Sequence, residues 1–237
     1  MVNLKAHVPW YQCGPASAGN GALMRIAPVI IPHLHKGGTD LWVDTTLLSM
    51  MTHNDAASTS ACLVFNAMLW DLLDMSAAPD PSWWVERYVE LAKDLEGETS
   101  YVPRGGNFTD YRGPLWRFVQ ERLPTAYEKN LSVFEACCEW YSGAYLFETL
   151  PSVLYTLMRH AHEPEEALVR AVNDTKDNDT IASIVGAAVG ALHGSSAFPE
   201  RWIKDLSGRL SFEGGAEEGE VFALIDKARS MFWDANS

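Results

Sequence analysis

The chain has 237 residues, of which 47% are hydrophobic, and a formal net charge of −13 from 18 basic and 31 acidic residues. This length and composition allow a substantial core and most simply a single domain. Binding to a phosphate backbone needs concentrated positive charge, and no Lys/Arg cluster interrupts the acidic excess, so we expect no nucleic-acid partner. The charge of an anionic ligand would have to be met locally, by metal ions, helix N-termini or backbone amides.

The expected cellular location follows from two further features. The sequence opens without a charged and then apolar leader, and we see no long apolar run after it, so we expect neither secretion nor a membrane partner, and a cytoplasmic location. The four cysteines show no CxxC pair and no zinc-finger spacing, which predicts reduced thiols: Cys13, Cys62, Cys137 and Cys138.

Helical periodicity dominates the chain, and strand alternation bounded by hairpin turns is not evident, so the sequence predicts an all-α fold in one compact multi-helix domain. Residues 1–16 carry no obvious helix, and glycine-rich polar loops are expected at 97–113 and 211–219. Helices are predicted over 22–35 (kinked at Pro28), 41–51, 56–75, 83–95, 115–123, 150–160, 165–172, 181–193, 201–210 and 220–233.

An acidic octet over 173–180 precedes the last strongly apolar helix. Hard cations such as Mg²⁺ prefer oxygen ligands, and Asp177, Asp179 and Thr180 offer three within four residues. Two carboxylates two residues apart inside a helix would point about 200° apart, so we expect an irregular turn, with Asp179 or Thr180 as N-cap and a helix starting near Thr180. The alternative is a polar turn with a capping residue and no metal.

Small residues recur every four positions in the helix that follows, at Ala182, Gly186, Gly190 and Gly194. Glycine inside a helix costs about 1 kcal/mol relative to alanine, so this stripe needs a packing reason. We expect another segment to approach the helix closely along this face. A tightly packed helix would in turn hold the acidic turn rigidly.

A second motif, SAGNGALMR, lies at 17–25. Gly19 and Gly21 flank Asn20 ahead of a predicted helix, which would let backbone N–H groups approach a pyrophosphate without obstruction by a Cβ atom. The motif matches neither a dinucleotide-binding fingerprint nor a P-loop. The alternative interpretation is a glycine-rich helix start without a ligand.

Four blocks in order, SAGNGALMRIAP at 17–28, THND at 52–55, FETLPSVLY at 147–155 and DNDTIASIVGAAVGALHG at 177–194, resemble the ADP-ribosylglycohydrolase family. The resemblance extends over nearly the whole chain, to the PERW segment at 199–202. It implies an all-α fold with a binuclear Mg²⁺ centre, and hydrolysis of the glycosidic bond between ADP-ribose and an acceptor such as a protein side chain.

The resemblance also implies site residues. The metal ligands fall on Asp177, Asp179 and Thr180, and the ADP-ribose cleft on the positions Ser17, Gly19, Asn20, Gly21 and His53. Glu148 lies in a matching block, but we interpret it as structural, near a helix start made by Pro151. No catalytic acid or base is assigned.

One departure from the family bears on the activity. The family carries a further N-terminal region with an acidic residue on an early helix and a Thr-Asp-Asp motif, and neither is found here; the nearest strings, at 38–41 and 43–46, follow the Gly-Asn-Gly loop. We therefore expect residues 1–237 to be the C-terminal two-thirds of the family domain, supplying part of the metal site. Three alternatives stay open: a hydrolase, a catalytically incomplete ADP-ribose-binding or regulatory module, and one part of a split enzyme completed by a second chain.

Overall fold

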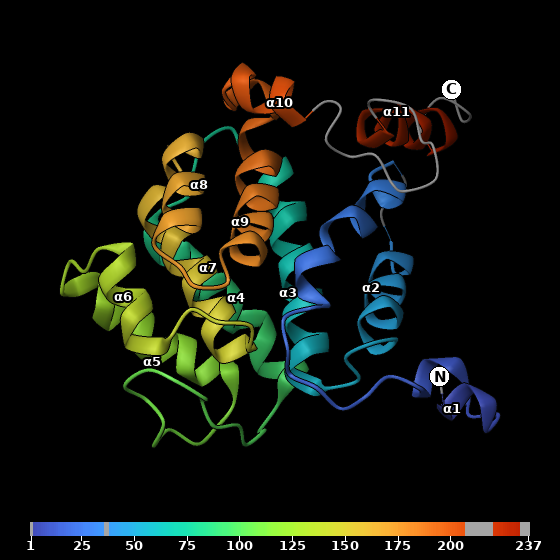
Figure 1. The fold of residues 1–237 in the computed structure, drawn as a ribbon, viewed down its shortest axis with the longest axis horizontal. Coiled ribbons are helices and arrows are strands. Elements are labelled where there is room, and N and C mark those ends of the chain that lie inside the picture. Colours follow the sequence, from blue (N-terminus) through green and yellow to red (C-terminus); the bar gives the residue numbers. More distant parts are fainter. Residues whose placement is uncertain (1, 36–37, 207–219, 233–237) are drawn as a thin grey trace.

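The computed structural model describes residues 2–35, 38–206 and 220–232 (Figure 1). Every regular element in these ranges is helical, and the backbone pairing outside helices is limited to two isolated bridges, Gly19 with Tyr145 and Tyr101 with Gly113. The chain is therefore a single all-helical domain. Its elements are α1 Val2–Lys5, η1 Trp10–Gln12, η2 Leu23–Arg25, η3 Ala27–His33, α2 Asp40–Met50, α3 Ala56–Leu73, α4 Pro81–Glu96, α5 Leu115–Glu128, α6 Val133–Trp140, α7 Leu146–His160, α8 Pro164–Asn173, α9 Asn178–His193, η4 Ser195–Ala197, α10 Glu200–Leu206 and α11 Glu220–Phe232.

The core forms around α3 and α7. Helix α7 contacts α4, α5, α6, α8 and α9, and every residue over 146–158 is buried. Helix α3 contacts α2, α4 and α9, and runs through the middle of the view in Figure 1. Because both helices are covered on several sides, even polar residues of α7 such as Glu148, Ser152 and Thr156 are buried.

Helix α3 corrects the expectation that no long apolar run is present. With 18 residues and a mean hydropathy of 1.3, it is long and apolar enough to cross a membrane, by length and composition alone. However, 67% of this stretch is buried inside the protein. Packing within the core accounts for its composition.

Nine of the ten predicted helices are present, as α2, α3, α4, α5, α7, α8, α9, α10 and α11, although α5 continues to Glu128 and α7 already begins at Leu146. The prediction was wrong over 22–35, which forms the 3-10 helices η2 and η3, because Pro28 and Pro32 lack the N–H groups that an α-helix needs there. It also missed α6, whose start is marked by a capping box between Ser132 and Glu135. The predicted loop at 211–219, the end of the helix at 201–210 and Trp233 lie outside the described residues.

The small-residue stripe of α9 has the predicted close packing at one of its glycines, Gly186. A Cβ atom on Gly186 would lie 3.3 Å from Cδ2 of Leu168 in α8, and one on Gly190 would lie 3.7 Å from the Phe198 ring. Gly194 ends the helix with a φ of +76°, a conformation that favours glycine. Helices α8 and α9 thus approach closely, and the acidic turn that joins them is held at both ends.

The two interior glycines of α9 should respond oppositely to substitution. Gly190→Ala meets only an ordinary van der Waals contact and should stabilise the fold by up to about 1 kcal/mol through helix propensity. Gly186→Ile would push its branched atoms into Leu168 and should cost about 1–3 kcal/mol through overpacking. Urea unfolding of both variants measures the difference, and equal effects would contradict close packing at Gly186.

Candidate functional site

Residues 142–145, which connect α6 to α7, join the two predicted motifs through backbone hydrogen bonds. The N–H groups of Lys176 and Asp177 donate to the Ser142 carbonyl, at 3.3 and 3.0 Å. On the other side, Asn20 N–H donates to the Ala144 carbonyl at 3.1 Å. The α6–α7 connection therefore fixes the Gly-Asn-Gly loop and the acidic turn next to each other.

The side chains of the two motifs also touch. The Asn20 amide nitrogen donates to the Asp177 carboxylate and, at 2.8 Å, to the Thr149 hydroxyl oxygen. The Thr149 hydroxyl donates its hydrogen to the Gly143 carbonyl at 2.7 Å, so toward Asn20 the Thr149 oxygen can only accept. The Asn20 amide must therefore point its nitrogen, not its oxygen, toward Thr149. Asn20 is 6% exposed and Thr149 fully buried, so this network holds one carboxylate oxygen of Asp177 in place from within the protein.

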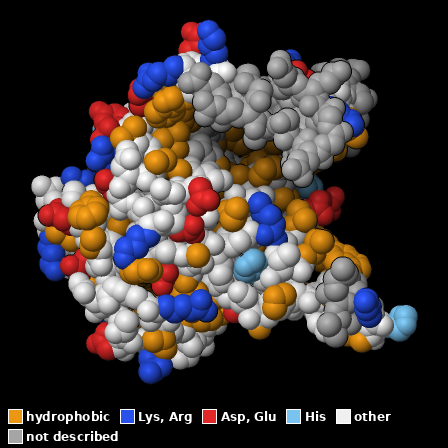
Figure 2. Space-filling model, viewed as in Figure 1, with side chains coloured by type: hydrophobic (Ala, Val, Ile, Leu, Met, Phe, Trp, Pro, Cys, Tyr) orange, Lys and Arg blue, Asp and Glu red, His pale blue; other side chains and the backbone are white. Residues whose placement is uncertain are grey.

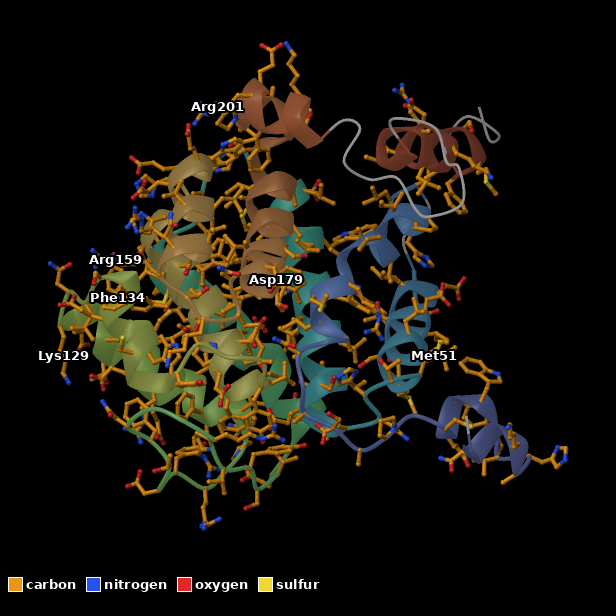
Figure 3. All side chains as sticks on the ribbon, in the orientation of Figure 1. Met51, Lys129, Phe134, Arg159, Asp179 and Arg201 are labelled. Atoms are coloured by element: carbon orange, nitrogen blue, oxygen red, sulfur yellow. The ribbon has the colours of Figure 1, made fainter. Side chains whose placement is uncertain are left out.

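The acidic turn differs from the sequence prediction at its helix start. Helix α9 begins at Asn178, two residues before the predicted start, and its N-cap is Asp177 rather than Asp179 or Thr180. Asp179 lies in the first helical turn, at the start of α9 in Figure 3, and its carboxylate accepts from the Thr180 N–H at 2.8 Å. Thr180 is 5% exposed, with its hydroxyl 3.8 Å from the Met24 sulfur.

The oxygen donors at this turn suit Mg²⁺ in kind but not in number. Two carboxylates and a hydroxyl are hard ligands, whereas Mg²⁺ requires six in an octahedral arrangement. Within the described ranges, no group of three or more His, Cys, Asp or Glu side chains could hold a metal ion. On the face shown in Figure 2, acidic, basic and histidine side chains gather near the centre, where Figure 3 places Asp179. The described residues of this turn therefore offer three oxygen donors and no complete ligand set.

Glu148 belongs to the same region, in the first turn of α7. Helix α7 begins at Leu146 and contains Pro151 in its interior, so the expectation of a helix start at Pro151 was wrong. Burial raises the pKa of the Glu148 carboxyl, and Asp177 raises it further, whereas the Tyr145 backbone, Arg104 and Lys176 act in the opposite direction. A Cβ atom at position 143 would lie 2.5 Å from Oε2 of Glu148, which explains the glycine there.

The Gly-Asn-Gly loop packs against the ring of His53. A Cβ atom on Gly21 would lie 2.8 Å from Cε1 of His53, and one on Gly19 would lie 3.2 Å from Nε2. The two glycines thus make room for the histidine, a reason that sequence reasoning had not given. Ser17 braces the same loop, since its hydroxyl oxygen accepts from the Gly19 N–H at 3.3 Å. The structure brings Ser17, Gly19, Asn20, Gly21 and His53 together.

His53 has two polar neighbours that sequence reasoning did not assign. The Thr52 hydroxyl lies 2.9 Å from Nδ1 of His53, and the Arg25 guanidinium donates both to the Thr52 hydroxyl and to the Gly21 carbonyl. Burial lowers the pKa of His53, and so does the charge of Arg25, while Asp55 raises it. Arg25 and Thr52 stand inside the quoted sequence blocks, which is the signal that could have indicated them.

Comparison with known proteins identifies the family of the chain. A model of the ADP-ribosylglycohydrolase family matches residues 1–230, and the chain belongs to that family. It is 23% identical over 214 residues to ADP-ribosylarginine hydrolase Tri1 of Pseudomonas putida, covering 90% of this chain and 47% of Tri1. Human ADP-ribosylhydrolase ARH3 is 23% identical over 210 residues, covering 82% and 55%, respectively.

A third relative, the ADP-ribosyl-(dinitrogen reductase) glycohydrolase of Rhodospirillum rubrum, is 24% identical over 209 residues, covering 87% of this chain and 57% of the relative. The chain thus spans about half the length of the curated relatives that it matches.

The buried network below Asp177 yields a stability prediction. Thr149→Val removes the acceptor of Asn20 and the donor to the Gly143 carbonyl without changing the side-chain shape, so it leaves buried polar groups unpaired. We expect a loss of about 1–3 kcal/mol in the free energy of unfolding. Thr149→Ser keeps the hydroxyl and serves as the control. Urea unfolding of the three proteins measures the free energy of unfolding. A valine variant as stable as the wild type would contradict the network.

Proposed function

We propose that this protein is a Mg²⁺-dependent hydrolase that cleaves the glycosidic bond between ADP-ribose and an acceptor. The observation that carries the proposal is the contact between Asn20 of the Gly-Asn-Gly loop and the Asp177 carboxylate, two residues 157 positions apart. This contact puts a loop suited to a diphosphate beside oxygen donors suited to Mg²⁺. Family membership and three relatives named for hydrolysis of ADP-ribosyl groups support it.

Different residues of the chain would bind the metal, orient its ligands and bind the diphosphate. Asp177, Asp179 and Thr180 would hold the metal, and Asn20 keeps the Asp177 carboxylate oriented. The N–H groups of Gly19 and Asn20 are engaged by Ser17 and by the Ala144 carbonyl, whereas the Gly21 N–H has no partner among the described residues. The Gly21 N–H and the His53 ring would therefore bind the diphosphate, a local device that an acidic protein needs for an anionic ligand. Glycosidic cleavage passes through an oxocarbenium-like transition state, and bound Mg²⁺ would orient oxygen atoms and activate water there.

The location of the activity belongs to the same proposal. All four cysteines are free, and Cys62 and Cys137 are buried. Free buried thiols suit a reducing compartment, since disulfides form mainly in oxidising ones. We propose that the protein acts in the cytoplasm.

The activity is tested by ADP-ribose release from arginine-linked and serine-linked ADP-ribosyl peptides, with and without Mg²⁺. Asp177→Asn keeps an oxygen that can accept from Asn20, so the fold should persist while Mg²⁺-dependent release falls by about 100-fold or more. Asp174→Asn is the matched control, because it removes one charge from the same turn at a residue paired with Arg170. Equal release by the two variants would refute the role of Asp177.

A second candidate is an ADP-ribose-binding or regulatory module without chemistry, alone or as one part of a split enzyme. The observation that favours it is the incomplete donor set, since no group of three acidic, histidine or cysteine ligands forms among the described residues. Calorimetry would then show ADP-ribose binding that depends little on Mg²⁺, together with no release. A native mass above that of one chain, found with a second polypeptide and accompanied by release, would indicate the split enzyme.

A further inference from the structure

The hydrogen atoms around His53 can be assigned from the donors and acceptors of three adjacent side chains. The Arg25 guanidinium has five N–H donors and no acceptor, so in its contact with Thr52 the hydroxyl oxygen must accept. The hydroxyl proton of Thr52 is then free to donate. Among the described residues its only acceptor is Nδ1 of His53, at 2.9 Å.

This assignment determines which ring nitrogen of His53 carries hydrogen. If Nδ1 accepts from Thr52, the neutral ring bears its hydrogen on Nε2. Nε2 lies 3.2 Å from the positions that Cβ atoms would take on Gly19 and on Gly21, so this nitrogen faces the loop. Within the part of the chain that the structure describes, Nε2 has no hydrogen-bond partner. A donor without a partner therefore faces the Gly-Asn-Gly loop.

The surroundings of the ring favour its neutral form. Burial disfavours an imidazolium, and the positive charge of Arg25 disfavours it further, with Asp55 opposing both. Arg25 also donates to the Gly21 carbonyl, so the same guanidinium connects the loop to Thr52. The Arg25 guanidinium thus orders the Gly-Asn-Gly loop and the Thr52 hydroxyl directly, and the His53 ring through Thr52.

We propose that Arg25 and Thr52 are positioning residues that hold His53 as the neutral tautomer with hydrogen on Nε2, so that Nε2–H donates to an oxygen of a nucleoside diphosphate lying on the Gly19–Gly21 loop. The identity of the ligand rests on the proposed function, whereas the tautomer does not. A neutral donor of this kind binds an anionic oxygen without a charged imidazole having to lose its hydration on burial.

The tautomer is tested by long-range ¹H–¹⁵N NMR of the full ¹⁵N-labelled chain, in which the shifts of the two ring nitrogens identify the one that bears hydrogen. We expect wild-type His53 to be neutral with hydrogen on Nε2 at neutral pH. Thr52→Val should lose this preference, and Thr52→Ser should keep it. Hydrogen on Nδ1 in the wild type, a charged ring, or unchanged shifts in Thr52→Val would overturn the proposal.

The binding role is tested by calorimetry with ADP-ribose on the same three proteins. Thr52 is exposed, so its variants should unfold at the same urea concentration as the wild type. We expect Thr52→Val to bind ADP-ribose about tenfold more weakly and Thr52→Ser within about twofold of the wild type. Equal affinities would overturn the donor role of Nε2–H. If the wild-type chain has the expected tautomer but shows no heat of binding, the positioning of His53 by Arg25 and Thr52 is supported and the assigned ligand is overturned. Failure of the proposed function is thus distinguished from failure of the positioning proposal.

Discussion

The structure depends on the few backbone hydrogen bonds made by the α6–α7 connection at 142–145. Its carbonyl groups accept from the loop that contains Asn20 on one side and from the turn that contains Asp177 on the other. Neither segment has regular structure of its own at these positions, so the connection is what sets their separation. Helix α7, buried over 146–158, anchors the connection in the core. A shift of 142–145 would therefore move both halves of the site relative to each other.

Two hydrogen-bond networks of known direction meet at the Gly-Asn-Gly loop. In one, the Asn20 amide nitrogen donates to Thr149 and to Asp177. In the other, the Arg25 guanidinium donates to the Thr52 hydroxyl and to the Gly21 carbonyl. In the first network the Gly143 carbonyl can only accept, which fixes the Thr149 hydroxyl and then the Asn20 amide. In the second the guanidinium can only donate, which fixes the Thr52 hydroxyl. Under the proposed function, such ordering would let an acidic protein with a net charge of −13 bind an anion without a basic patch.

The sequence predicted the helices well where apolar residues recur at helical spacing. The prediction failed at prolines inside helical patterns. Pro28 and Pro32 turn 22–35 into 3-10 helices. Pro151, in contrast, lies inside α7, because the packing of this helix on several sides outweighs one missing hydrogen bond. The two motifs could be recognised separately, and the stripe on α9 indicated its close packing. The contact between Asn20 and Asp177 could not be derived from spacing, since 157 positions separate them. Thr149 stands inside the quoted block at 147–155, but its contacts with Asn20 and the Gly143 carbonyl come only from the tertiary structure.

The reliance on main-chain atoms at 142–145 has an evolutionary consequence. Ala144 contributes only its carbonyl group to the loop, and any amino acid provides that, so mutation can replace this residue while leaving the framework intact. Ser142 is more constrained, because its buried hydroxyl also accepts from the Lys176 N–H at 3.0 Å. Gly143 is constrained as well, because Oε2 of Glu148 lies 2.5 Å from the position that its Cβ atom would take. A framework held by a carbonyl group thus tolerates a change of side chain at position 144 without moving the loop that contains Asn20.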